Sequence, residues 1–173
     1  MAISLYDATV ASYLQGLGAV SGFLERGLEH CKDSGTDTDE LVEARIHPDM
    51  LPLRFQLISV AHHSLGAIEG VKAGLFQPPP RATGLSYTDL QGLVANAHAA
   101  LAAMQPGEVE ALQGRDMVFK VGERTMPFVA EDFLLSFSVP NFYFHATTAY
   151  DILRQQGVPL GKRDFMGQLR LKS

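Results

Sequence analysis

Four long stretches of the sequence carry apolar residues at intervals of three or four positions, and this spacing limits the possible folds more than any other feature. In the first stretch, about 4–32, the apolar residues are Tyr6, Val10, Tyr13, Leu17, Val20, Leu24 and Leu28. Such intervals align side chains on one face of an α-helix. Similar stripes occupy about 52–75, 86–104 and 130–156. Each stripe must be covered by another, so the sequence predicts an all-α protein, a four-helix bundle.

The connections between the predicted helices contain a short helix and a β-hairpin. Residues 37–45 begin with acidic residues placed to cap a short helix. Residues 115–128 break the helical rhythm, because two β-prone runs flank Gly122-Glu123. We therefore expect a small hairpin between the third and fourth helices. Pro140 lies inside the fourth stretch and predicts a kink there.

Length and charge limit the class of protein and its partners. A chain of 173 residues suits one domain, expected to span 1–173, with a sizeable hydrophobic core. The formal net charge is −5. An acidic surface repels phosphate backbones, so no nucleic-acid partner is expected.

Cysteine content and hydropathy bear on the compartment. Cys31 is the single cysteine, so no intrachain disulfide can form and a reducing compartment fits. The first basic residue is Arg26, so the beginning of the chain does not resemble a secretory signal. Residues 133–150 carry no formal charge, but their serine, threonine, asparagine and histidine side chains favour a buried helix over a membrane span. We expect a cytoplasmic protein without a membrane partner.

Histidines on the predicted inner faces are the candidate functional residues. His145 lies on the apolar stripe of the fourth helix, and His62 flanks the stripe of the second helix on the same side as Glu69. Histidines that point inward from different helices can act together as the ligands of a metal ion in a bundle. The alternative is that each is a hydrogen-bonded core or boundary histidine. His62 and His63 are adjacent and point about 100° apart, so they cannot easily hold one ion together. The residue four positions after His145 is Ala149, so the pair of histidines at i and i+4 is absent.

Three glycines recur every four residues in the second predicted helix, namely Gly66, Gly70 and Gly74. Each glycine inside a helix costs about 1 kcal/mol relative to alanine. Close approach of another backbone is the simplest reason for such a ridge. The partner is either a helix of the same bundle or a second subunit, and closed two-fold homodimers are the commonest oligomers.

Two parts of the sequence carry a resemblance to a known family. The C-terminal part contains Pro140–His145, Thr148–Tyr150, Ile152–Arg154, Gly157-Val158 and Gly161–Phe165. The central part contains Ala44-Arg45, Pro48–Met50, Pro52-Leu53 and Gln56. Over nearly its whole length the sequence resembles an uncharacterised bacterial family, a domain of unknown function that is grouped with the DinB/YfiT-like metalloenzymes.

The resemblance implies a DinB-like four-helix bundle, often a homodimer. It also implies a divalent metal such as zinc or nickel, held by one histidine of helix two and two of helix four, and some members of the superfamily are thiol-dependent transferases or isomerases. Carried over to this sequence, His62 or His63 would supply the helix-two ligand, and His145 would supply one helix-four ligand. The second helix-four histidine is missing, so the implied metal site is incomplete.

Three functions stay open at this point, and the first-ranked interpretation is a bundle with an incomplete metal site and no assignable reaction. A metal-dependent enzyme would activate a water between His62, His145 and Glu69, with Tyr143 or Asn141 orienting a small substrate. A binding protein would use His145 and Asn141 as hydrogen-bonding groups in an apolar cavity that holds a small ligand. The third possibility is a homodimeric interaction protein that functions through its surface.

Overall fold

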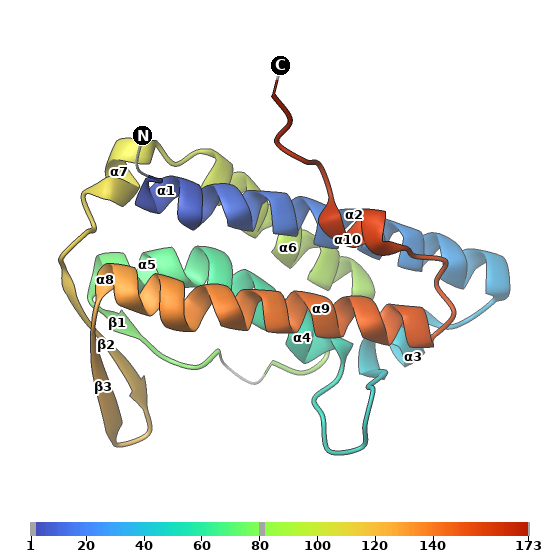
Figure 1. The fold of residues 1–173 in the computed structure, drawn as a ribbon. Helices are drawn as coiled ribbons and strands as arrows, with labels where there is room; N and C mark the ends of the chain where they lie inside the picture. The colour runs from blue at the N-terminus through green and yellow to red at the C-terminus, as the bar shows by residue number, and fades with distance from the viewer. Residues whose placement is uncertain (1–2, 80–81, 173) are drawn as a thin grey trace.

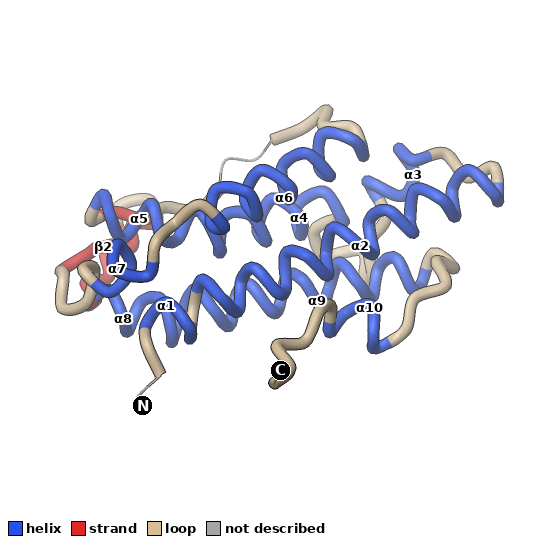
Figure 2. The backbone as a smooth tube through the Cα atoms, turned by 90° about the horizontal axis from the view of Figure 1, so that it is seen from above, coloured by secondary structure: helices blue, strands red, loops and turns tan. Residues whose placement is uncertain are grey.

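Four long helical segments form the bundle that the apolar stripes predict (Figure 1). The structure is a computed structural model that describes residues 3–79 and 82–172. The first segment is α1 and α2, the second α4 and α5, the third α6, and the fourth α8 and α9. Their bounds are Leu5–Ala8 (α1), Val10–Ser34 (α2), Leu53–Ala61 (α4), Ala67–Ala73 (α5), Tyr87–Ala102 (α6), Ala130–Asp132 (α8) and Val139–Gln155 (α9). Seen from above, the segments run side by side along the length of the molecule (Figure 2).

The first segment differs from the single helix predicted over 4–32. It is interrupted at Thr9, whose hydroxyl donates back to the carbonyl of Leu5 at 2.6 Å. The hydroxyl shares the Leu5 carbonyl with the backbone N–H of Thr9, and such a bond from a threonine side chain often bends a helix. The helix then ends at Gly35, which has a positive φ of 74°. The predicted short helix is confirmed as α3 (Thr38–Glu43), which is capped by the Asp37 carboxylate.

The second and fourth segments each contain a wide π turn that the sequence pattern did not predict. The first π turn (His62–Gly66) joins α4 to α5, and the second π turn (Phe133–Ser138) joins α8 to α9. A kink was predicted at Pro140, and the departure from α-helical geometry is found one turn earlier, in the second π turn. Pro140 has no N–H for the carbonyl of Ser136, so the preceding turn is the one that departs from α-helical geometry.

A three-stranded sheet lies at one end of the bundle, where only a hairpin was predicted (Figure 1). The hairpin is confirmed as β2 (Asp116–Val121) and β3 (Arg124–Val129). The added strand is β1 (Leu75–Phe76), which pairs in parallel with β2. Helix two was therefore predicted too long. It ends before Gly74, whose φ of 73° suits a left-handed cap, and Leu75 is exposed in the strand rather than inward.

The three glycines of the second segment are explained by contacts within this chain. The backbone that approaches them is a strand, and not the helix that was predicted. A Cβ at Gly70 would lie 2.9 Å from the Phe76 ring and 3.2 Å from the Leu75 carbonyl oxygen, so β1 approaches the helix closely there. Gly66 faces the His62 ring, and Gly74 is the helix cap. The ridge therefore gives no evidence for a second subunit.

Buried apolar side chains from all four segments form the core, which includes Cys31 at 3% exposure. Two short helices, α7 (Pro106–Glu110) and α10 (Lys162–Met166), complete the described part of the chain. Ser86 and Asp89 cap the start of α6 through a reciprocal pair of hydrogen bonds. Among the described residues, no helix combines the length and the hydropathy that crossing a bilayer requires.

Candidate functional site

Two histidines from different helices stack against each other inside the bundle. His63 comes from the first π turn and His145 from α9, and their ring centroids lie 5.7 Å apart with an angle of 14° between the planes. His63 is buried and His145 is half-buried. The sequence left His62 and His63 as alternatives for helix two, and the structure brings His63 to His145.

Gln56 of α4 holds His145 in one orientation. Its Nε2 donates to the carbonyl of Leu51 at 2.8 Å, which places Oε1 toward His145. Because an amide oxygen only accepts, His145 Nδ1 must carry the proton of their 2.8 Å hydrogen bond. The Nε2 of His145 then carries the lone pair. The sequence analysis did not include Gln56 among the candidate site residues. It named Gln56 only as one of the residues that carry the family resemblance.

Both stacked imidazoles are neutral at pH 7. Burial lowers the pKa of His145 to about 4. Burial, together with charge repulsion from the neighbouring His145 and His62, lowers the pKa of His63 to about 3. Two buried polar atoms of the second segment, His63 Nδ1 in the pair and Ser59 Oγ in α4, have no hydrogen-bond partner in the described part of the chain. The site therefore offers unprotonated ring nitrogens in a poorly solvated environment.

The residues around the pair do not match the divalent metal site that the resemblance implies. Catalytic zinc sites use three protein ligands. The position four residues before His145 is Asn141, whose amide donates to the carbonyl of Phe137 in its own helix at 2.7 Å. Across residues 3–79 and 82–172, no three histidine, cysteine, aspartate or glutamate side chains gather closely enough to hold an ion. Two histidines without a third ligand do not fit such a metal, and we derive no metal-dependent step.

Of the other predicted site residues, His62 contacts the pair, with its ring centroid 5.6 Å from that of His63, whereas Glu69 and Tyr143 interact elsewhere. Glu69 is exposed and forms an ion pair with Lys72 at 3.1 Å. Tyr143 is 40% exposed on the outer face of α9. His62 stacks on Phe76, with ring centroids 4.4 Å apart, and its Nε2 lies 2.7 Å from the carbonyl oxygen of Gln77.

An apolar cleft lies beside His62, between the second segment, α6 and the connection that precedes α6. Its volume is about 450 Å³. Most of its lining is aliphatic, including Ile58, Leu65, Leu85 and Leu93. Its polar side chains are His62, Glu69 and Asn96. The sequence analysis expected a cavity at His145 and Asn141, whereas this cleft has His62 and Glu69 in its wall.

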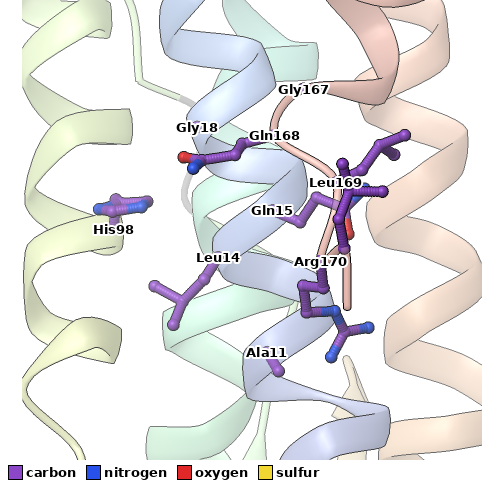
Figure 3. Close-up of a pocket in the computed structure, with 10 residues that line it drawn as sticks. Ala11, Leu14, Gln15, Gly18, His98, Gly167, Gln168, Leu169 and Arg170 are labelled. Carbon is purple, nitrogen blue, oxygen red and sulfur yellow. The ribbon is translucent and has the colours of Figure 1, made fainter. Parts of the chain in front are cut away.

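A second groove, of about 600 Å³, lies along α2 between His98 of α6 and the C-terminal tail (Figure 3). Gln15 of α2 donates to the carbonyl of Met166 at 2.9 Å and so holds the start of the tail. Figure 3 shows Gln168 extending from the tail toward α6, which carries His98. The groove mixes polar and apolar groups, and none of its polar side chains is deeply buried.

The comparisons place this architecture among DinB-like helical bundles. A crystal structure of a DinB family member protein from Shewanella denitrificans matches with a TM-score of 0.81, covering 98% of this chain and 95% of that chain at 21% sequence identity. At that identity the match shows the fold alone. The family model described as "Domain of unknown function (DUF1993)" matches residues 5–166, so the chain belongs to this family. The resemblance seen in the sequence is confirmed, and no curated protein matches the chain.

Replacing Gln56 by leucine is expected to lower the free energy of unfolding by about 1–3 kcal/mol, because His145 Nδ1–H and the Leu51 carbonyl both lose a buried partner. Urea unfolding at pH 7 measures this change. Gln155→Leu, at an exposed position of α9, is the matched control and should have little effect. Nitrogen-15 NMR of the wild-type protein should show the Nδ1–H tautomer of His145. An Nε2–H tautomer would contradict the assigned hydrogen bond.

Proposed function

We propose that this protein binds a small apolar molecule, uncharged or positively charged, in the cleft beside His62. The observation that carries the proposal is the cleft itself. Its volume of about 450 Å³ lies within the usual range for ligand pockets, and a mostly aliphatic wall with a few polar groups is typical of them. The proposal places the protein among non-catalytic small-molecule-binding proteins, and the stacked histidines then serve the structure of the bundle.

The polar groups of the cleft favour a ligand with a hydrogen-bond donor. The carbonyl of Gln77 can only accept, so His62 Nε2 carries the proton and Nδ1 carries the lone pair. Burial lowers the pKa of His62, which keeps the ring neutral at pH 7. Glu69, which is paired with Lys72, adds carboxylate oxygens at the rim. A hydroxyl or an ammonium group suits these acceptors, whereas a carboxylate would be repelled.

Fluorescent probes test the site directly. The neutral probe N-phenyl-1-naphthylamine is expected to bind with enhanced fluorescence, and the anionic probe 1-anilinonaphthalene-8-sulfonate is expected to bind at least ~10-fold more weakly. Leu93→Trp should fill the cleft and abolish binding of the neutral probe. Leu135→Trp, at an exposed position of the second π turn, is the control and should leave binding unchanged.

Two results would refute this function. One is the absence of probe binding to a wild-type protein whose circular dichroism shows an intact helical fold. The other is equal binding to the wild-type protein and to a folded Leu93→Trp variant, because the probe would then bind elsewhere.

A further inference from the structure

The absence of a side chain at Gly66 keeps one ring nitrogen of His62 open to the apolar cleft. Both residues line the cleft. A Cβ at Gly66 would lie 3.0 Å from His62 Nδ1, which is closer than ordinary van der Waals contact. In the described part of the chain His62 Nδ1 has no hydrogen-bond partner, and unlike His63 Nδ1 it is not sealed from solvent. Its lone pair is therefore free to accept from a ligand.

Three contacts fix the direction of this lone pair. The His62 ring stacks on Phe76, with centroids 4.4 Å apart and an angle of 30° between the planes. Its Nε2–H donates to the carbonyl of Gln77 at 2.7 Å, and His63 meets the ring edge-on with centroids 5.6 Å apart. A ring held in this way loses little freedom when a ligand binds. His62 Nδ1 is thus a preorganised acceptor for one donor group.

We propose that the ligand of the cleft is an uncharged aliphatic alcohol, whose hydroxyl donates to His62 Nδ1 while its chain packs on the aliphatic wall. This assignment rests on the proposed binding function and narrows it to one chemical class. A neutral imidazole nitrogen with a lone pair only accepts, and a hydroxyl supplies the donor. An ether or a ketone of the same size has no donor, so it would displace water from Nδ1 and leave that nitrogen unpaired.

The charges of the cleft favour a hydroxyl over an ammonium group. The titratable side chains in its wall are His62 and Glu69. His62 carries no charge at pH 7, because burial lowers its pKa. Glu69 is exposed, and its carboxylate already pairs with Lys72 at 3.1 Å. An ammonium group would lose its water without gaining an unpaired negative charge. The remaining polar side chain of the wall, Asn96, both donates and accepts, so it does not discriminate between the two.

Displacement of the neutral fluorescent probe by two isomers tests the assignment. n-Octanol and heptyl methyl ether contain the same atoms, but only the alcohol has a donor. A purely apolar cleft would favour the ether, because the ether gives up no O–H bond to water. For the wild-type protein, the Kd of n-octanol should be about 3–10-fold lower than that of the ether. Octylammonium should bind more weakly than n-octanol. Equal or stronger binding of the ether, or of octylammonium, would overturn the assignment.

Gly66→Ala tests the role of the open nitrogen. Gly66 has right-handed helical angles (φ −59°, ψ −31°), so alanine fits its backbone. The added methyl group should cover His62 Nδ1 and abolish the preference for the alcohol, with the Kd of the ether changed by less than about 2-fold. Gly22→Ala, where a Cβ meets no atom within 4 Å, is the control and should keep the preference.

His62→Phe provides a second test, because it removes the acceptor and retains an aromatic ring beside Phe76. This variant should also lose the preference for the alcohol, and circular dichroism establishes that each variant is folded. A preference that persists in folded Gly66→Ala or His62→Phe protein would overturn the role of His62 Nδ1. The result also distinguishes the two proposals. A wild-type protein that does not bind the probe refutes the binding function, whereas one that binds the probe but does not prefer n-octanol refutes only the alcohol.

Discussion

Lowering the pH from 7 to 4.5 is expected to reduce the free energy of unfolding by on the order of 2 kcal/mol for each of His63 and His145. The pKa of each is lower in the folded protein, at about 3 and about 4, than the ordinary value of 6.5. The unfolded chain therefore binds more protons than the folded chain at pH values between these limits. Stability is fully present above pH 6.5 and is lost as the pH falls toward the folded-state values. Urea unfolding at constant ionic strength measures the effect.

Between pH 6.5 and 4.5 the loss of stability comes from protonation of the histidines and not from protonation of the carboxylates. Hydrogen bonding lowers the pKa values of Glu43, Asp89 and Glu131 below their ordinary values of 4.5 for glutamate and 3.8 for aspartate. Their contributions are therefore lost only at lower pH. His63→Leu removes one buried imidazole at similar volume and should flatten the profile between pH 6.5 and 4.5. An unchanged profile in this variant would show that His63 is not buried as a neutral ring.

Gly27→Ala is expected to destabilise the protein by about 2–4 kcal/mol, although alanine is the better helix former. A Cβ at this position of α2 would collide with the hydroxyl of Tyr87. That hydroxyl is buried and donates to the carbonyl of Leu24 at 2.7 Å. The substitution therefore breaks a buried hydrogen bond and overfills the contact between α2 and α6. Thermal and urea unfolding measure the loss.

The same helix supplies the matched control. Gly22 has no atom within 4 Å of its hypothetical Cβ, so Gly22→Ala should raise stability by about 0.5–1 kcal/mol. Tyr87→Phe removes the oxygen that the new methyl group would meet. Gly27→Ala combined with Tyr87→Phe should therefore lose less stability than the two single losses added together. Strict additivity would show that the cost of Gly27→Ala arises elsewhere.

Most of the fold follows from local sequence patterns. The apolar stripes predicted the four helical segments, and Asp37 and Ser86 marked the starts of two helices because their side chains cap backbone N–H groups. The strand β1 was not predictable in this way. Two residues carry no periodicity, and their strand geometry depends on pairing with β2, more than forty positions later in the sequence.

The candidate site was predicted only in part, for a geometric reason. His145 stood out because an ionisable residue on an apolar stripe needs a partner. Its partner Gln56 lies 89 positions away and carries no chemical signal of its own in the sequence. The cleft beside His62 was also beyond sequence reasoning, because its wall combines residues of the second segment, α6 and the connection between them. Such convergence depends on tertiary packing.

The two π turns have a consequence for comparing this chain with other helical bundles. Each turn uses hydrogen bonds from residue i to residue i+5, and so accommodates one more residue than an α-helical turn. The turns touch, because the hydroxyl of Ser138 donates to the carbonyl of His63 at 2.8 Å. An alignment with a bundle of regular helices must therefore open a one-residue gap in both helices at the same level. Without these gaps, His63 and His145 would be matched to positions on the wrong helix faces, so functional residues should be transferred to this family by superposition of structures.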